Sequence, residues 1–131
     1  MQPFGNDLKS NFEFNQSLAP AARAASANGS AIDCGAYDGP LCAEFGFGTC
    51  TDGGYTPSLE ESEDGTSNFT AITPYEGSFS EVTDSAGGSA IQSVMFKSSR
   101  RYVRCVLTES TAGTTGVPCY GNILGRNKNV V

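Results

Sequence analysis

Cysteines and carboxylates are the side chains of this chain that could do chemistry, because its 131 residues include no histidine. Without histidine, the chain lacks the usual base of a nucleophilic triad and the commonest metal ligand. No two of the five cysteines have the C-x-x-C spacing of zinc sites, which leaves open only a zinc site built of distant cysteines. A reactive cysteine needs a cationic neighbour, and strand alternation places Arg104 on the face opposite to Cys105. We therefore expect no enzymatic activity, no metal and no cofactor.

Acidic side chains gather in one predicted turn, at Glu60, Glu61, Glu63 and Asp64. A glycosidase needs two carboxylates that face each other across a cleft, whereas a run of acids in a turn is typical of a solvated loop. The segment is also shorter than an EF-hand loop and lacks its closing glutamate. A simple calcium site in this turn stays open as an alternative.

A basic cluster at Lys97, Arg100, Arg101 and Arg104 stands out in a chain whose net charge is −6. This acidic balance argues against nonspecific binding to nucleic acid. Arginine suits bidentate contacts with carboxylates. The cluster is either ordinary surface charge around a turn or an attachment patch for an acidic protein surface.

Strict alternation of apolar residues predicts a strand at residues 41–50, with Leu41, Ala43, Phe45 and Phe47 on its buried face. Asp52-Gly53-Gly54 suits a tight hairpin turn. Residues 55–62 then form the return strand, and residues 69–72 follow the acidic turn as a third strand. We expect these three strands to form a β-meander, the unit around which the fold is built.

Further strands are predicted at residues 30–34, 91–96, 101–109 and 117–124, and a long surface loop at residues 74–89. Roughly seven or eight short strands with frequent turns are typical of a β-sandwich or jelly roll. The sixteen glycines fit such a turn-rich chain. We expect an all-β fold, a small antiparallel β-sandwich resembling a jelly roll, over residues 28–131.

The last two predicted strands bear on two cysteines. If they form a hairpin across a three-residue loop at residues 111–113, Cys105 lies opposite Cys119. We expect these thiols to be buried, adjacent and reduced, and to behave as small apolar side chains.

Residues 1–27 differ from the rest, because phenylalanines at positions 4, 12 and 14 are scattered among polar residues and a run of small residues follows. We expect an extended N-terminal arm that docks Phe4, Phe12 and Phe14 on a partner. The first nine residues have neither the charged leader nor the apolar core of a signal peptide, so we expect a reducing cytosol and free thiols. No apolar run approaches the ~20 residues of a membrane helix, and no membrane contact is expected.

The pattern T-D-G-x-x-T-P-x-L-x-E-S-x-D-G-x-S-x-F, from Thr51 to Phe69, resembles the capsid decoration, or cement, proteins of tailed bacteriophages. Two flanking pieces fit the same family in the same order. They are residues 17–23 with 27–29, and residues 99–104 with the Gly/Thr turn at 112–116. The chain departs from the family in its five cysteines and in Gly46-Phe47-Gly48, where the family has aliphatic residues.

This resemblance implies a small β-sandwich without enzymatic activity that is made in the host cytoplasm and binds the major capsid protein on the exterior of the virion. It also implies dimers or trimers on the capsid lattice. The hypothetical capsid-binding residues are Phe4, Phe12, Phe14, Lys97, Arg100, Arg101 and Arg104. The alternative is a carbohydrate-binding or adhesin-like β-sandwich of a phage tail or cell surface, which would stack sugars on Tyr37, Tyr55, Tyr75 or Tyr120, although the chain has no tryptophan.

Overall fold

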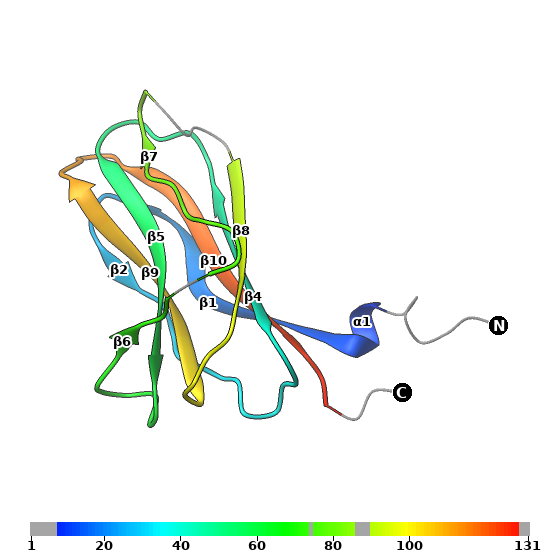
Figure 1. The fold of residues 1–131 in the computed structure, drawn as a ribbon. Coiled ribbons are helices and arrows are strands. Elements are labelled where there is room, and N and C mark those ends of the chain that lie inside the picture. The colour runs from blue at the N-terminus through cyan, green and yellow to red at the C-terminus, as the bar shows by residue number, and fades with distance from the viewer. Residues whose placement is uncertain (1–7, 74, 86–89, 129–131) are drawn as a thin grey trace.

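Two antiparallel sheets pack face to face in the computed structural model, which describes residues 8–73, 75–85 and 90–128 (Figure 1). A short helix, α1 (Leu8–Asn11), precedes the strands. The strands are β1 (Phe12–Arg23), β2 (Ala27–Asn28), β3 (Ile32–Asp33), β4 (Leu41–Phe47), β5 (Gly54–Ser62), β6 (Thr70–Ala71), β7 (Val82–Thr83), β8 (Ala90–Phe96), β9 (Tyr102–Thr111) and β10 (Val117–Arg126). Within the described ranges, no helix is long and apolar enough to cross a membrane. The predicted all-β sandwich is confirmed.

The first sheet, sheet A, has the strand order β1-β10-β4-β8. Its strands alternate between the core and the outer surface, as half-buried strands do. In β4, the four residues predicted to face the core are all buried: Leu41, Ala43, Phe45 and Phe47. The periodicity of the sequence therefore predicted the inner face of this strand correctly.

The second sheet, sheet B, has the order β2-β9-β5-β6, with β3 added on β9 and β7 on β5. Strands β5 and β9 pair from Tyr55↔Glu109 to Ser62↔Tyr102. On its other edge, β5 meets β7 only at Gly54 and Tyr55 and β6 only at Glu60 and Glu61. Pro57 lies between these contacts, where the missing N–H interrupts no ladder, and this explains a proline in a strand with neighbours on both sides.

The core lies between the sheets and is filled mainly by apolar side chains. Its fully buried members include Phe45, Tyr55, Leu59, Val103, Leu107, Val117 and Ile123. Burial of each such side chain contributes roughly 1.5–3 kcal/mol. The two sheets approach closely at Gly121, where an added Cβ would lie 3.0 Å from the Cys105 Sγ atom. Glycine at this position leaves the space for that thiol.

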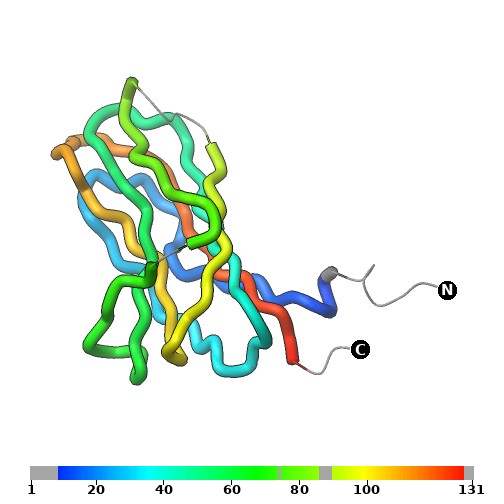
Figure 2. The backbone as a smooth tube through the Cα atoms, in the orientation of Figure 1, coloured from blue at the N-terminus to red at the C-terminus, as the bar shows by residue number. Residues whose placement is uncertain are grey.

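The predicted β-meander is wrong at its first turn. Strand β4 pairs with β10 and β8, whereas β5 pairs with β9, β6 and β7. The segment between them, which includes Asp52, crosses from one sheet to the other, and Figure 2 shows the tube passing over the upper end of the sandwich here. Only the second half of the meander, the β5–β6 pair, forms as predicted.

The predicted hairpin between the last two strands is also wrong. Strand β9 lies in sheet B and β10 in sheet A, so Cys105 pairs with Leu59 and Cys119 pairs with Phe47. Both thiols are nevertheless free and buried, as predicted. The two cysteines are not opposite each other as expected, because the connection after Thr111 leads from sheet B to sheet A instead of forming a hairpin.

The predicted N-terminal arm of residues 1–27 is likewise wrong in its second half, which belongs to sheet A. Strand β1 pairs with β10 from Phe12↔Arg126 to Arg23↔Val117, with two register shifts on the way. Leu18 belongs to the core, with 2% of its surface exposed. Small residues suit this irregular edge strand. In Figure 1, α1 and the start of β1 project from the body beside the end of β10, while residues 1–7, including Phe4, lie outside the described part.

Candidate functional site

The outer face of sheet A is built from residues that pair across its four strands and therefore point the same way. One apolar row runs from strand to strand through Phe14, Leu124, Cys42 and Met95. The next row is polar and runs through Gln16, Asn122, Glu44 and Ser93. The following row contains Tyr120, Gly46 and Ile91. We call these the first, second and third rows.

Exposed apolar side chains of large size occur, among the described residues, only in the first and third rows. They are Phe14, Ile91 and Met95, with 67%, 68% and 42% of their surface exposed. Glu44 is the one charged side chain within the three rows, and it accepts a hydrogen bond from the Asn122 side chain at 3.3 Å. Two further charges border the rows, because Glu76 pairs with Met95 at the edge of β8 and Arg126 pairs with Phe12 one row below. Depletion of charge together with exposed apolar side chains is the compositional mark of an interface core.

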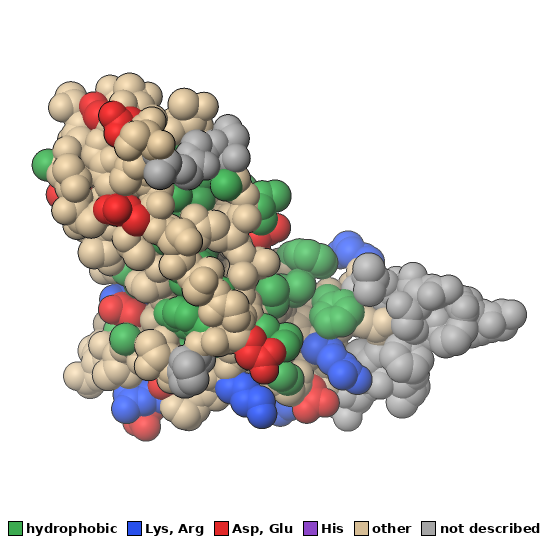
Figure 3. Space-filling view, turned by 45° about the horizontal axis from the view of Figure 1, so that its top comes forward, with side chains coloured by type: hydrophobic (Ala, Val, Ile, Leu, Met, Phe, Trp, Pro, Cys, Tyr) green, Lys and Arg blue, Asp and Glu red, His purple; other side chains and the backbone are tan. Residues whose placement is uncertain are grey.

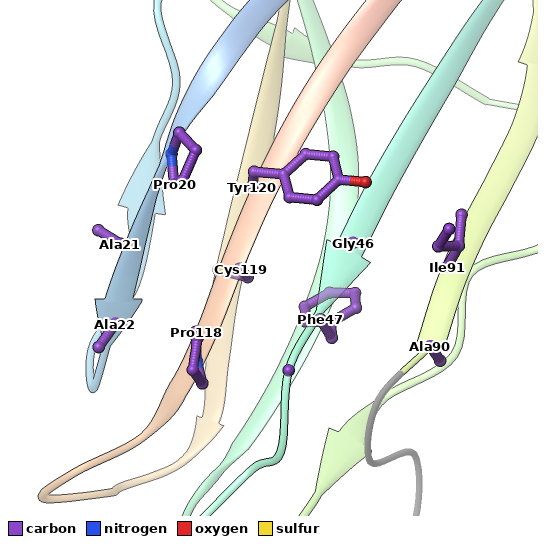
Figure 4. A pocket seen from close by; sticks show the side chains of 11 residues that line it. Pro20, Ala21, Ala22, Gly46, Phe47, Ala90, Ile91, Pro118, Cys119 and Tyr120 are labelled. Carbon is purple, nitrogen blue, oxygen red and sulfur yellow. The ribbon is translucent and has the colours of Figure 1, made fainter.

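A shallow groove of about 770 Å³ follows the third row toward the upper end of the sheet. Figure 4 shows the Tyr120 ring extending from β10 across Gly46 of β4 toward Ile91 of β8, with Pro20 and Pro118 on the other side. A Cβ atom at Gly46 would collide with the Tyr120 ring. Gly46, one of the positions at which the chain departs from the capsid decoration proteins, therefore leaves space for the Tyr120 ring to lie flat on β4. Burial and the neighbouring Glu44 carboxylate raise the pKa of Tyr120.

Basic side chains collect at the lower end of the sandwich. The turn after β8 carries Lys97, Arg100 and Arg101, and the end of the chain brings Arg126 and Lys128 to the same place. The links are backbone and side-chain bonds: Cys34 N–H to the Arg101 carbonyl, Asp38 N–H to the Arg126 carbonyl, and Lys128 Nζ to the Gly35 carbonyl. We call Lys97, Arg100, Arg101, Arg126 and Lys128 the basic end. In the view of Figure 3, blue side chains lie at the lower end, with red ones among them, and near the projecting segment, while the upper end shows only red ones.

Two arginines of the predicted cluster are already engaged within the chain. Arg101 donates to both carboxylate oxygens of Asp33, at 2.9 and 2.8 Å, and this contact holds the pKa of Asp33 at about 2. Arg104 donates to Glu60 at 2.6 Å and stacks its guanidinium 3.6 Å from the centre of the Phe69 ring. Both charges are balanced by these partners. Arg104 therefore belongs to the outer surface of sheet B, where it contacts Glu60 and Phe69.

The remaining predicted binding residues lie in two places. Lys97 is exposed and Arg100 is half-buried, and no ion pair involves either of them among the described residues. Phe14 is exposed on the outer face of sheet A, and Phe12, two residues before it on β1, is half-buried. Arg126 and Lys128 fall outside the predicted cluster, because the contact of the chain end with residues 34–38 is not visible in their spacing.

The acidic residues act as acceptors for loops of the chain. Asp64 accepts hydrogen bonds from the backbone N–H groups of Thr66 and Ser67 and from the Ser67 and Ser62 hydroxyls, and these bonds lower its pKa. Glu61 is buried, which raises its pKa, but bonds from Ser98 and Ser99 outweigh this effect and leave the pKa below its ordinary value. Within the described ranges, no group of three or more potential ligands could hold a metal ion.

The tyrosines proposed for sugar stacking have different positions. Tyr55 is fully buried in the core, so it is unable to stack on a ligand. Tyr37 and Tyr75 pack against the core, and their hydroxyls bond to Asn15 and to the Leu59 N–H. Tyr120 alone of the four lines the groove.

Comparison with known proteins gives no relative: the sequence matches no protein-family model, and neither a curated protein nor a solved structure is significantly similar to it.

Proposed function

We propose that this chain is a structural virion protein that binds the outer surface of a bacteriophage capsid and stabilises the head, without catalysis. A subunit that binds the assembled shell but not its loose parts stabilises the shell by its binding free energy. Many copies with weak individual bonds add up through multivalency.

The observation that carries this proposal is the role of the residues that make up the resemblance to capsid decoration proteins. Asp52, in the central motif, accepts the N–H groups of Thr114, Thr115 and Gly116, which form the Gly/Thr turn of the last matching piece. Pieces separated by about half of the chain thus meet in one hydrogen-bonded cap, which lowers the pKa of Asp52.

The other matching pieces make similar connections. Glu61 of the central motif holds Ser98 and Ser99, where the second flanking piece begins. The Ser17 hydroxyl of the first piece accepts the Cys105 N–H at 2.8 Å. The resemblance therefore rests on residues that hold the sandwich together, which supports a likeness of the scaffold.

The basic end is the part that we propose to contact the shell. Its lysines and arginines would meet acidic groups of the major capsid protein, and such contacts weaken as salt screens them. The exposed Lys97 and Lys128 are the residues whose removal should matter most, since Arg101 already pairs with Asp33.

The experiment adds the purified chain to phage heads that lack it and measures the bound copies and the temperature at which the heads release DNA. We expect binding, an increase in this temperature, and a loss of occupancy in the Lys97→Ala and Lys128→Ala variants that is largest at low salt, because added salt screens the lysine contacts of the parent chain as well. Thr108→Asp, an equal change of charge at an exposed position of sheet B, is the matched control. Heads that bind no chain at low salt would overturn the proposal.

A further inference from the structure

We infer that Glu61 is a positioning residue of the basic end. It holds in one conformation the turn between β8 and β9, which carries Lys97, Arg100 and Arg101, and it does not touch the shell itself. This role rests on the proposed function and adds to it a residue that lies beneath the contact surface. Glu61 is near the end of β5 in sheet B, whereas the turn leads from sheet A to sheet B (Figure 1).

The Glu61 side chain is buried under this turn, where the residue exposes 9% of its surface. One carboxylate oxygen accepts the Ser98 hydroxyl at 2.8 Å and the Ser99 N–H at 2.9 Å, and the other accepts the Ser99 hydroxyl at 2.9 Å. Hydrogen bonds to an ionised acceptor are stronger than neutral ones. A buried carboxylate also needs such donors to offset its loss of hydration, so Glu61 and the turn hold each other in place.

The network continues from the serines to the basic residues. Ser98 Oγ accepts the Arg100 N–H at 3.2 Å, so the backbone is fixed on both sides of Ser99. Arg101 has its own carboxylate partner. Lys97 and Arg100 form no ion pair among the described residues, and their positions therefore depend on the backbone that Glu61 holds.

The Glu61 charge lies under a surface that we propose to bind acidic groups, and charge alone would make its loss favourable for binding. An ordered turn has the opposite effect, because a surface that is fixed before contact loses less conformational entropy on binding. We therefore expect the loss of the Glu61 side chain to weaken binding, although the chain becomes less acidic.

The test measures binding to phage heads that lack the chain, at low salt, for the parent, Glu61→Ala and Glu63→Ala. Both variants remove one negative charge, but Glu63 is exposed and makes no hydrogen bond or ion pair within the described ranges. We expect Glu63→Ala to bind at least as tightly as the parent, and Glu61→Ala to bind at least about fivefold more weakly.

A conservative variant separates the hydrogen bonds from the charge. Glu61→Gln removes the same charge, but its amide can accept the Ser98 hydroxyl and the Ser99 N–H and can donate to the Ser99 hydroxyl oxygen. We expect Glu61→Gln to recover most of the binding that Glu61→Ala loses.

Hydrogen exchange in the free chain separates a local effect from general loss of stability. In Glu61→Ala, the Ser99 N–H should exchange faster than in the parent, whereas the Cys105 N–H, which the Ser17 hydroxyl accepts in the core, should keep its protection. Equal acceleration at Ser99 and Cys105 would show general destabilisation and would overturn this role.

The binding outcomes distinguish this role from the proposed function. Heads that bind no parent chain would overturn the proposed function and this role with it. Heads that bind the parent but bind Glu61→Ala as tightly as Glu63→Ala would overturn this role alone. Binding by Glu61→Gln that is as weak as that of Glu61→Ala would also overturn it, because the hydrogen bonds of the turn would then not decide the affinity.

Discussion

Cys42 differs from the other four cysteines because it is half-buried on the outer face of sheet A, whereas Cys34, Cys50, Cys105 and Cys119 are buried. Burial raises the pKa of Cys34 and of Cys105 to about 12. The thiolate is the reactive form of cysteine, so these two thiols are doubly protected, by lack of access and by lack of ionisation.

We predict one accessible thiol per chain in the native state at low protein concentration. A thiol reagent at mildly alkaline pH should label Cys42 first, and the other four cysteines only after denaturant is added. The Cys42→Ser variant is the control and should lose the early phase. Rapid labelling of Cys105 or Cys119 in the native protein would contradict the buried positions described above.

Residues far apart in sequence form contacts that spacing alone does not predict. The basic cluster is predicted either as ordinary surface charge or as an attachment patch, and in the structure Arg101 pairs with Asp33 and Arg104 pairs with Glu60. Which opposite charges face each other across two strands depends on the register of the strands, and the spacing of the residues does not give this register. These residues lie on the surface as predicted, but their spacing does not identify their partners.

At the scale of the strands, Ser17 connects the two sheets. Its hydroxyl in β1 accepts the Cys105 N–H of β9 at 2.8 Å and donates to the Ser30 carbonyl at 2.7 Å. The Cys105 N–H is buried among core residues, and an unsatisfied buried donor costs about 1–3 kcal/mol.

We therefore predict that Ser17→Ala lowers the free energy of unfolding by about 1–3 kcal/mol, measured by urea denaturation. Ser30→Ala is the matched control, because Ser30 is exposed and provides its backbone carbonyl to this contact. Equal stability of the two variants would show that the hydroxyl of Ser17 does not link the sheets.

The turn between β5 and β6 predicts how stability responds to acid. Hydrogen bonds from Thr66, Ser67 and Ser62 lower the pKa of Asp64 below its ordinary value of about 3.9. A lowered pKa in the folded state means that the carboxylate stabilises the fold above about pH 4 and that this contribution is lost as the pH falls toward the folded-state pKa.

Asp64→Asn, which keeps the size but removes the charge, should lower the urea midpoint at neutral pH. It should also lose less stability than the parent chain between about pH 4 and pH 2. Asp84→Asn, an exposed aspartate after β7, is the control. Parallel pH profiles for the parent and Asp64→Asn would contradict the role of this turn.

Alternation of apolar residues predicted β4, β5, β8, β9 and β10 and the buried face of β4, but it missed β1 and did not show which strands pair. The inner face of β4 is the same whether the next strand pairs beside it or crosses to the other sheet. The segment Asp52-Gly53-Gly54 suits a connection between two sheets as well as it suits a hairpin turn. The pairs β4–β5 and β9–β10 were therefore predicted as neighbours although they lie in different sheets.

At the scale of the whole molecule, the chain presents two surfaces of different character. The outer face of sheet A exposes large apolar side chains, with Glu44 among them and Glu76 and Arg126 at their borders. The basic end gathers lysines and arginines in a chain of net charge −6. We propose that the basic end contacts the shell.

The most direct measurement is a cryo-electron microscopy map of the intact phage particle together with the number of chains per particle. The account predicts density for this sandwich on the outside of the head, in hundreds of copies, with its basic end toward the major capsid protein. A handful of copies on the tail would instead favour the carbohydrate-binding or adhesin-like alternative, and absence of the chain from the particle would contradict the account.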